Sequence, residues 1–75
     1  MNESMVKLAA DILGMTSDEA RKNSKSIPEI DAAYFWESTR GGKAIIVNEN
    51  CEKLAATSSV SFEDHVQAFI NGKRN

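Results

Sequence analysis

The stretch AIIVNENCEKLAAT, residues 44–57, decides the fold that this sequence predicts. It contains three β-branched residues in a row, 45–47, which give the strongest strand signal in the chain. Polar turn residues follow at 48–51, and a second extended segment, 52–57, runs back from them. We therefore predict an antiparallel β-hairpin whose tip lies at residues 48–51.

The register of this hairpin depends on the length of its loop. A loop of three residues, 49–51, pairs Ile46 with Leu54 and Ala44 with Ala56, which brings apolar side chains together on one face. A loop of two residues would instead place a lysine opposite Ile46. We predict the three-residue loop, because its register matches the face that we expect to be buried.

The lone cysteine has a structural role in this prediction. Loops of three residues commonly join a type I turn to a left-handed residue, a position where glycine is favoured. In the predicted register this position falls to Cys51. We therefore expect a positive φ at Cys51, which is a strained choice for a residue with a Cβ atom.

An aromatic run precedes the hairpin. Tyr34, Phe35 and Trp36 are consecutive, and aromatic residues favour strands, so residues 33–38 are predicted to be a strand. A helix that continues through this run is the alternative, and it would reduce the sheet to the hairpin alone. The glycine pair in the segment 40–42 separates this element from the hairpin.

Two amphipathic helices are predicted near the ends of the chain. Residues 5–13 place their apolar side chains on one broad face, and Gly14 suits a left-handed helix end. Residues 62–71 carry an apolar stripe, and Ser61 can cap the first turn of this helix.

A short surface helix is predicted between them. Thr16 and Glu19 have the spacing of a capping box, and basic residues up to Lys25 would lie near the end of this helix. Residues 26–33 are ambiguous. Ser26 and Glu29 have the spacing of a capping box, Pro28 would lie in the first turn, and a short helical turn through Ile30 fits them.

These elements predict an α+β fold: an N-terminal helix, a short second helix, a three-stranded antiparallel meander and a C-terminal helix packed on the sheet. The first and last helices should cover the sheet. The residues expected to be among the most buried are Leu8, Ile12, Ile46, Leu54, Phe62, Val66 and Phe69.

Length and composition limit the class of protein. The 75 residues are expected to form one small domain, 1–75. Apolar residues make up 41% of the chain and charged residues 27%, which is ordinary for a folded protein. A single cysteine allows no internal disulfide, which favours a reducing compartment and a cytoplasmic location. No apolar run approaches the roughly 20 residues of a membrane span, and no signal peptide is recognisable.

The candidate interaction surface comprises Tyr34, Trp36, Arg40 and Lys43. Strand alternation sends Tyr34 and Trp36 to one face and Phe35 to the other, so one of the two sets can be exposed. The segment Arg40-Gly41-Gly42-Lys43 could expose backbone N–H groups between two cations, but it lacks the spacing of a phosphate-binding loop. A turn between strands is the favoured interpretation of this segment.

We assign no catalytic residue, no cofactor-binding residue and no metal ligand. Acidic neighbours of Cys51 oppose formation of its thiolate, and the only histidine, His65, would have to reach it from the last helix. The sequence shows no metal-binding constellation. We therefore expect that the protein is not an enzyme and has no cofactor.

The sequence does not identify a function, and two hypotheses stand. The first is a non-enzymatic protein-interaction module that binds an unknown protein or itself. Residues 45–47 are apolar toward both sheet faces, so either two helices or a second copy, as in a homodimer, must cover them. The alternative is a nucleic-acid accessory protein that uses Arg40, Lys43, Lys73 and Arg74, which the net charge of −2 disfavours.

Overall fold

The structure of the protein is a computed structural model that describes residues 2–38, 42–57 and 59–75. Strands of the described residues form one antiparallel sheet with the order β1-β2-β3-β4, so each strand pairs with its neighbour in sequence. The elements are α1 (Glu3–Leu13), α2 (Ser17–Lys22), β1 (Ser24–Ile27), the short 3₁₀ helix η1 (Pro28–Ile30), β2 (Ala32–Trp36), β3 (Lys43–Asn48), β4 (Lys53–Thr57) and α3 (Phe62–Ile70).

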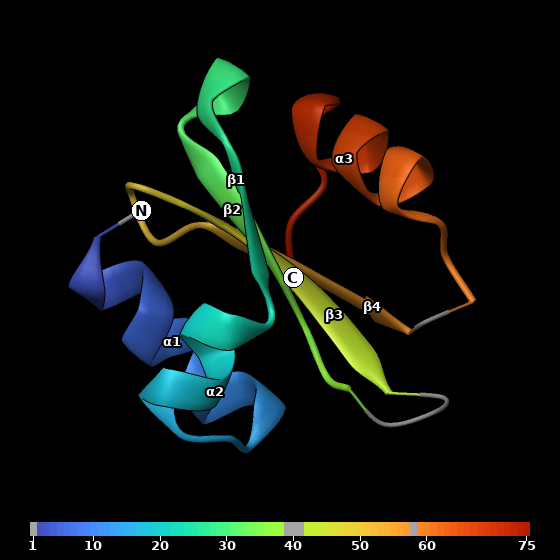
Figure 1. The fold of residues 1–75 in the computed structure, drawn as a ribbon. Coiled ribbons are helices and arrows are strands. Elements are labelled where there is room, and N and C mark those ends of the chain that lie inside the picture. Colours follow the sequence, from blue (N-terminus) through green and yellow to red (C-terminus); the bar gives the residue numbers. More distant parts are fainter. Residues whose placement is uncertain (1, 39–41, 58) are drawn as a thin grey trace.

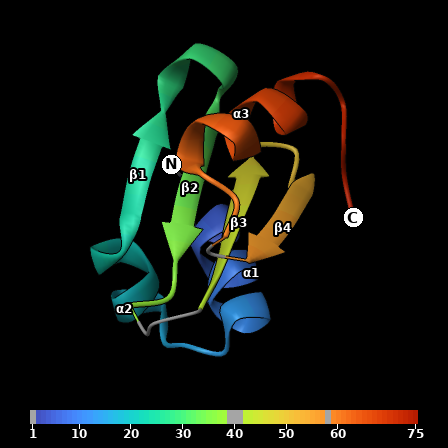
Figure 2. The same cartoon turned by 90° about the vertical axis from the view of Figure 1, so that its right-hand side faces the viewer.

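Helices cover both faces of the sheet. Figures 1 and 2 show α1 and α2 on one face and α3 on the other, with the sheet between them. The α+β class is confirmed, and so is the prediction that the first and last helices cover the sheet.

The sheet has four strands, so the prediction of a three-stranded meander was wrong. The additional strand is β1, which pairs with β2 through Lys25 opposite Tyr34. We had placed Lys25 at the end of the second helix, but α2 ends at Lys22 and the chain then extends. A Ser-Lys-Ser segment has little strand propensity of its own, so its strand conformation comes from pairing with β2. The predicted helical turn through Ile30 is present as η1, but Ser26 does not cap it, because Ser26 belongs to β1.

The hairpin of β3 and β4 has the predicted register. Ile46 lies opposite Leu54, and Ala44 lies opposite Ala56. At the tip, the backbone N–H of Cys51 donates to the carbonyl oxygen of Asn48 at 2.9 Å, and φ at Cys51 is 60°. The three-residue loop and the left-handed cysteine are both confirmed.

One hydrophobic cluster lies between α1 and the sheet. Small side chains at Ala9 and Ala10 let the helix approach the strands closely, and both are buried. The buried members of this cluster are Met5, Val6, Ala9, Ala10, Leu13, Ala20, Ala33, Phe35, Ile45 and Val47. Leu8 and Ile12, which we expected among the most buried residues, are only partly buried at its margin, because the buried face of α1 is centred on the two alanines.

A second cluster lies beneath α3. Ile46 and Phe69 are buried in it, as predicted, at 0% and 3% exposure. Leu54, Phe62 and Val66 are only partly buried, because α3 has nine residues and covers only part of its face of the sheet.

The two clusters account for the apolar run in β3. Ile45 and Val47 are buried under α1, and Ile46 is buried under α3. Both faces of this strand are therefore covered by helices of the same chain. The run no longer supports a homodimer formed through a sheet face.

Candidate functional site

Three aromatic side chains meet beside the N-terminal end of α3. The ring centroid of Tyr34 lies 4.8 Å from that of Phe62 and 5.8 Å from that of Trp36. All three side chains are partly exposed, and we call Tyr34, Trp36 and Phe62 the aromatic cluster. At its rim the exposed Lys25 holds its Nζ atom 4.7 Å from the ring centroid of Phe62, which is a cation–π distance.

Strand alternation and pairing build this cluster. Tyr34 and Trp36 are two residues apart on β2, so both point to the α3 face, whereas Phe35 points to the α1 face and is fully buried. Lys25 lies directly opposite Tyr34 on β1 and therefore shares its face.

The start of α3 supplies the third ring. The hydroxyl oxygen of Ser61 accepts a hydrogen bond from the backbone N–H of Asp64 at 3.1 Å, which fixes the first turn of the helix. Phe62 is consequently the first residue of α3 and lies where the helix reaches β2.

Tyr34 makes ring contacts with both other members of the aromatic cluster. Its ring also packs edge-on against the imidazole of His65, with centroids 5.5 Å apart. Burial raises the pKa of the Tyr34 phenol above its usual value of 10.0, because the charged phenolate would lose solvation. The cluster is therefore an apolar surface with a neutral tyrosine and a cationic rim.

The structure brings together only part of the predicted interaction surface. Tyr34 and Trp36 share one face, as alternation required. Lys43 points to the other face, because its neighbour Ala44 is the cross-strand partner of Trp36. Arg40 lies outside the described residues.

Sequence reasoning missed two residues of this surface. Phe62 was assigned to the core, and Lys25 to a helix end. The capping motif at Ser61 indicated where α3 begins, but it gave no information on which strand that end would meet. Because the sequence did not predict β1, it did not predict that Lys25 lies opposite Tyr34.

Among the cations proposed for nucleic-acid binding, Lys43 and Arg74 lie apart. Arg74 stacks on the ring of Phe69 at 3.6 Å and lies 3.9 Å from Glu52, beside the hairpin tip. Lys43 is the first residue of β3 and pairs with Thr57 at the far end of the β3–β4 ladder. Glu52, beside Arg74, is bonded to Asn48 at the other end of β3, and Asn48 is five residues from Lys43. Five residues of a strand span roughly 16 Å, so Lys43 and Arg74 lie near opposite ends of the hairpin.

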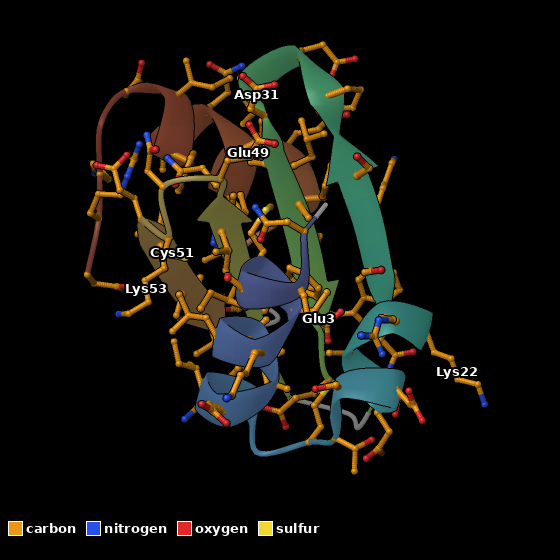
Figure 3. The ribbon with its side chains drawn as sticks, turned by 90° about the vertical axis from the view of Figure 1, so that its left-hand side faces the viewer. Glu3, Lys22, Asp31, Glu49, Cys51 and Lys53 are labelled. Carbon is orange, nitrogen blue, oxygen red and sulfur yellow. The ribbon has the colours of Figure 1, made fainter. Side chains whose placement is uncertain are left out.

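Cys51 and His65 are not arranged as a catalytic pair. Cys51 is exposed on the hairpin tip (Figure 3). His65 is 1% exposed, and its Nε2 atom lies 2.6 Å from the carbonyl oxygen of Leu54. Its Nδ1 atom is buried without a hydrogen-bond partner in the described part of the chain.

Neither Cys51 nor His65 lines either of two small hollows on the described surface. The first measures about 130 Å³, and its acidic residues Asp31 and Glu49 lie side by side in Figure 3. The second, the apolar hollow, measures about 250 Å³ and is lined by Ile12, Lys43, Ala55, Ala56 and Thr57. Hollows that bind organic ligands usually measure about 300–1,000 Å³.

Within residues 2–38, 42–57 and 59–75, no cluster of three or more His, Cys, Asp or Glu side chains is placed to hold a metal ion. The helices of these residues all lack the length and apolar character that crossing a membrane requires. Comparisons of the chain with protein-family models, with curated proteins and with solved structures found no match.

Proposed function

We propose that this chain is a non-enzymatic interaction module that binds a partner protein through the aromatic cluster. The observation that carries the proposal is that Tyr34, Trp36 and Phe62 are in ring contact while none of them is fully buried. Tyrosine and tryptophan are enriched at the energetic centres of protein interfaces, where a rigid ring supplies much contact area at a small entropy cost.

The rim of the cluster adds a charge. Lys25 is held beside Phe62 and remains exposed, so a carboxylate on the partner could pair with its ammonium group when the rings are covered. The partner surface that fits is therefore apolar at its centre with an acidic residue at its edge.

The non-enzymatic part of the proposal is supported by the placement of the two most reactive side chains. The imidazole of His65 is buried against Leu54, whereas the thiol of Cys51 is exposed on the hairpin tip. Catalysis by these groups would need both to reach one substrate.

The test uses a photo-crosslinking amino acid introduced at Lys25, on the rim of the cluster. A matched control carries it at Lys22, which is exposed on α2 and extends away from the body of the molecule (Figure 3). In native-cell extract we expect a crosslinked protein from position 25 that is absent from position 22. Adding Trp36→Ala should abolish that crosslink.

Two results would contradict the proposal. One is equal crosslinking to the same proteins from positions 22 and 25. The other is crosslinking from position 25 that survives Trp36→Ala, provided that circular dichroism shows the variant to be folded.

A further inference from the structure

Asn75 bonds backbone groups on the outer edge of β4. Asn75, at the end of the segment that follows α3, donates its backbone N–H to the carbonyl oxygen of Lys53 at 3.1 Å. Its side-chain amide bonds both backbone groups of Ala55: Oδ1 accepts from the N–H at 2.9 Å, and Nδ2 donates to the carbonyl oxygen at 3.0 Å. Figure 2 shows this last segment running beside β4.

The amide of Asn75 therefore takes the place of a peptide group of a fifth strand. A residue of an antiparallel neighbour would exchange the same two hydrogen bonds with Ala55. Lys53 adds a contact from its Nζ atom to the backbone oxygen of Asn75. Without Asn75, β4 would expose the N–H and carbonyl groups that make sheet edges pair with other chains.

We propose that the outer edge of β4 is a self-association surface, on which β4 of a second copy pairs antiparallel about Ala55, and that Asn75 blocks this pairing. The proposal is independent of the partner-binding function assigned to the aromatic cluster. It concerns an edge of the sheet, whereas the homodimer considered from the sequence concerned a face.

The backbone of β4 satisfies the symmetry that such a pairing needs. Both backbone groups of Ala55 point outward, as their bonds to Asn75 show, so two copies related by a two-fold axis would exchange two hydrogen bonds there. The carbonyl oxygen of Lys53 and the N–H of Thr57 point outward in the same way, because these residues lie two on either side of Ala55, whereas the carbonyl oxygen of Thr57 accepts from the N–H of Val60 at 3.1 Å. In the dimer each Lys53 carbonyl oxygen would accept from the N–H of Thr57 of the other copy in place of the N–H of Asn75.

The side chains of β4 also suit a second copy. Pairing about Ala55 brings the two small alanines together and sets each Lys53 against Thr57 of the other copy, so no like charges face each other. The apolar hollow lies along this edge, and Ala55 and Ile12 line it. The two hollows would meet near the two-fold axis and cover each other.

The first test compares the sedimentation of three full-length proteins over a range of concentrations. Asn75→Ala removes both side-chain bonds to Ala55, and Asn71→Ala removes an exposed amide from the same segment as the control. We expect Asn75→Ala to dimerise at concentrations where the wild type and Asn71→Ala remain monomeric. A monomeric Asn75→Ala, or equal association of all three proteins, would overturn the proposal.

The second test examines the register in the Asn75→Ala background. Thr57→Lys would place two like-charged pairs across the interface, opposite Lys53, and Thr57→Glu would place two opposite-charged pairs there. Each substitution should shift the dimer dissociation constant roughly fivefold, weakening for lysine and tightening for glutamate. Shifts of the same sign for both would exclude this pairing.

A third variant separates the two proposals. Trp36→Ala in the Asn75→Ala background should leave the dimer dissociation constant unchanged, because Trp36 lies on β2 and does not reach the edge of β4. Loss of the dimer in this variant would assign the association to the aromatic cluster and overturn the β4 proposal, while leaving partner binding through that cluster intact.

Discussion

His65 on α3 and Leu54 on β4 are joined by a buried hydrogen bond, with 2.6 Å between the imidazole Nε2 atom and the carbonyl oxygen. A carbonyl oxygen can only accept, so Nε2 carries a proton; of the two neutral tautomers, only the Nε2–H form can make this bond. This bond fixes α3 to the strand beneath it.

The imidazole tautomer is therefore the first prediction. Nitrogen NMR of the folded protein should show His65 as the Nε2–H form, because the bond to Leu54 selects it. His65→Ala should lower the free energy of unfolding by about 2–4 kcal/mol, through a lost hydrogen bond and a cavity. A dominant Nδ1–H form would contradict this geometry.

Tyr34 should titrate at a higher pH in the folded protein than in the unfolded chain. It is the only tyrosine, so the ultraviolet absorbance of tyrosinate reports on it alone. Burial raises its pKa, so we expect the midpoint above 10.0 when folded and near that value in denaturant. A folded midpoint at or below the denatured one would show that the phenol is not desolvated.

The same shift predicts how stability depends on pH. The folded state holds the Tyr34 proton more tightly, so its contribution to the free energy of unfolding is complete below about pH 10 and is lost as the pH rises through the folded pKa. Denaturant titrations of wild type and Tyr34→Phe should differ by a constant amount below that pH, and above it the wild type should lose stability relative to Tyr34→Phe.

Phe69 should be essential for folding. This residue of α3 is packed with Ile46 of the sheet and is 3% exposed, so Phe69→Ala should lower the free energy of unfolding by about 3–5 kcal/mol. The whole free energy of unfolding of a small domain is roughly 5 kcal/mol, so circular dichroism should show that the variant is largely unfolded. The control, Lys22→Ala on the exposed face of α2, should change stability by less than about 0.5 kcal/mol. Reversed effects would mean that the buried faces are wrongly assigned.

The turn at Cys51 gives the fifth prediction. Its φ of 60° is strained for a residue with a Cβ atom. Cys51→Gly should be neutral or stabilising by up to about 1 kcal/mol, because relief of strain offsets the greater entropy of the unfolded chain. Cys51→Val, with a branched Cβ, should destabilise the protein in the same denaturant titration. Clear destabilisation by glycine would contradict the turn geometry.

The hairpin could be predicted from the sequence because its register and turn depend only on residues that are close together in the chain. The apolar pattern of residues 44–57 and the length of one turn were sufficient to place Ile46 opposite Leu54 and to make Cys51 left-handed. The short helix α2 was equally local, since Thr16 and Glu19 form the capping box that their spacing indicates.

Features that depend on tertiary contacts could not be predicted in this way. Lys25 is in a strand only because β2 lies beside it, and no local propensity signals that neighbour. The helical periodicity of α1 indicated a broad apolar face, but the choice of Ala9 over Leu8 as its buried centre depends on how closely the sheet approaches. For the same reason, the contact between Phe62 and Tyr34 emerged only from the structure.

The order of the strands has a consequence for folding kinetics. Because each strand pairs with its neighbour in sequence, every step of sheet assembly closes only a short loop, and short loops close at a small entropic cost. Folds with such local pairing reach the native state faster than folds that must join distant strands. The two helices that cover the sheet come from opposite ends of the chain, so each can dock on a preformed meander without threading past the other.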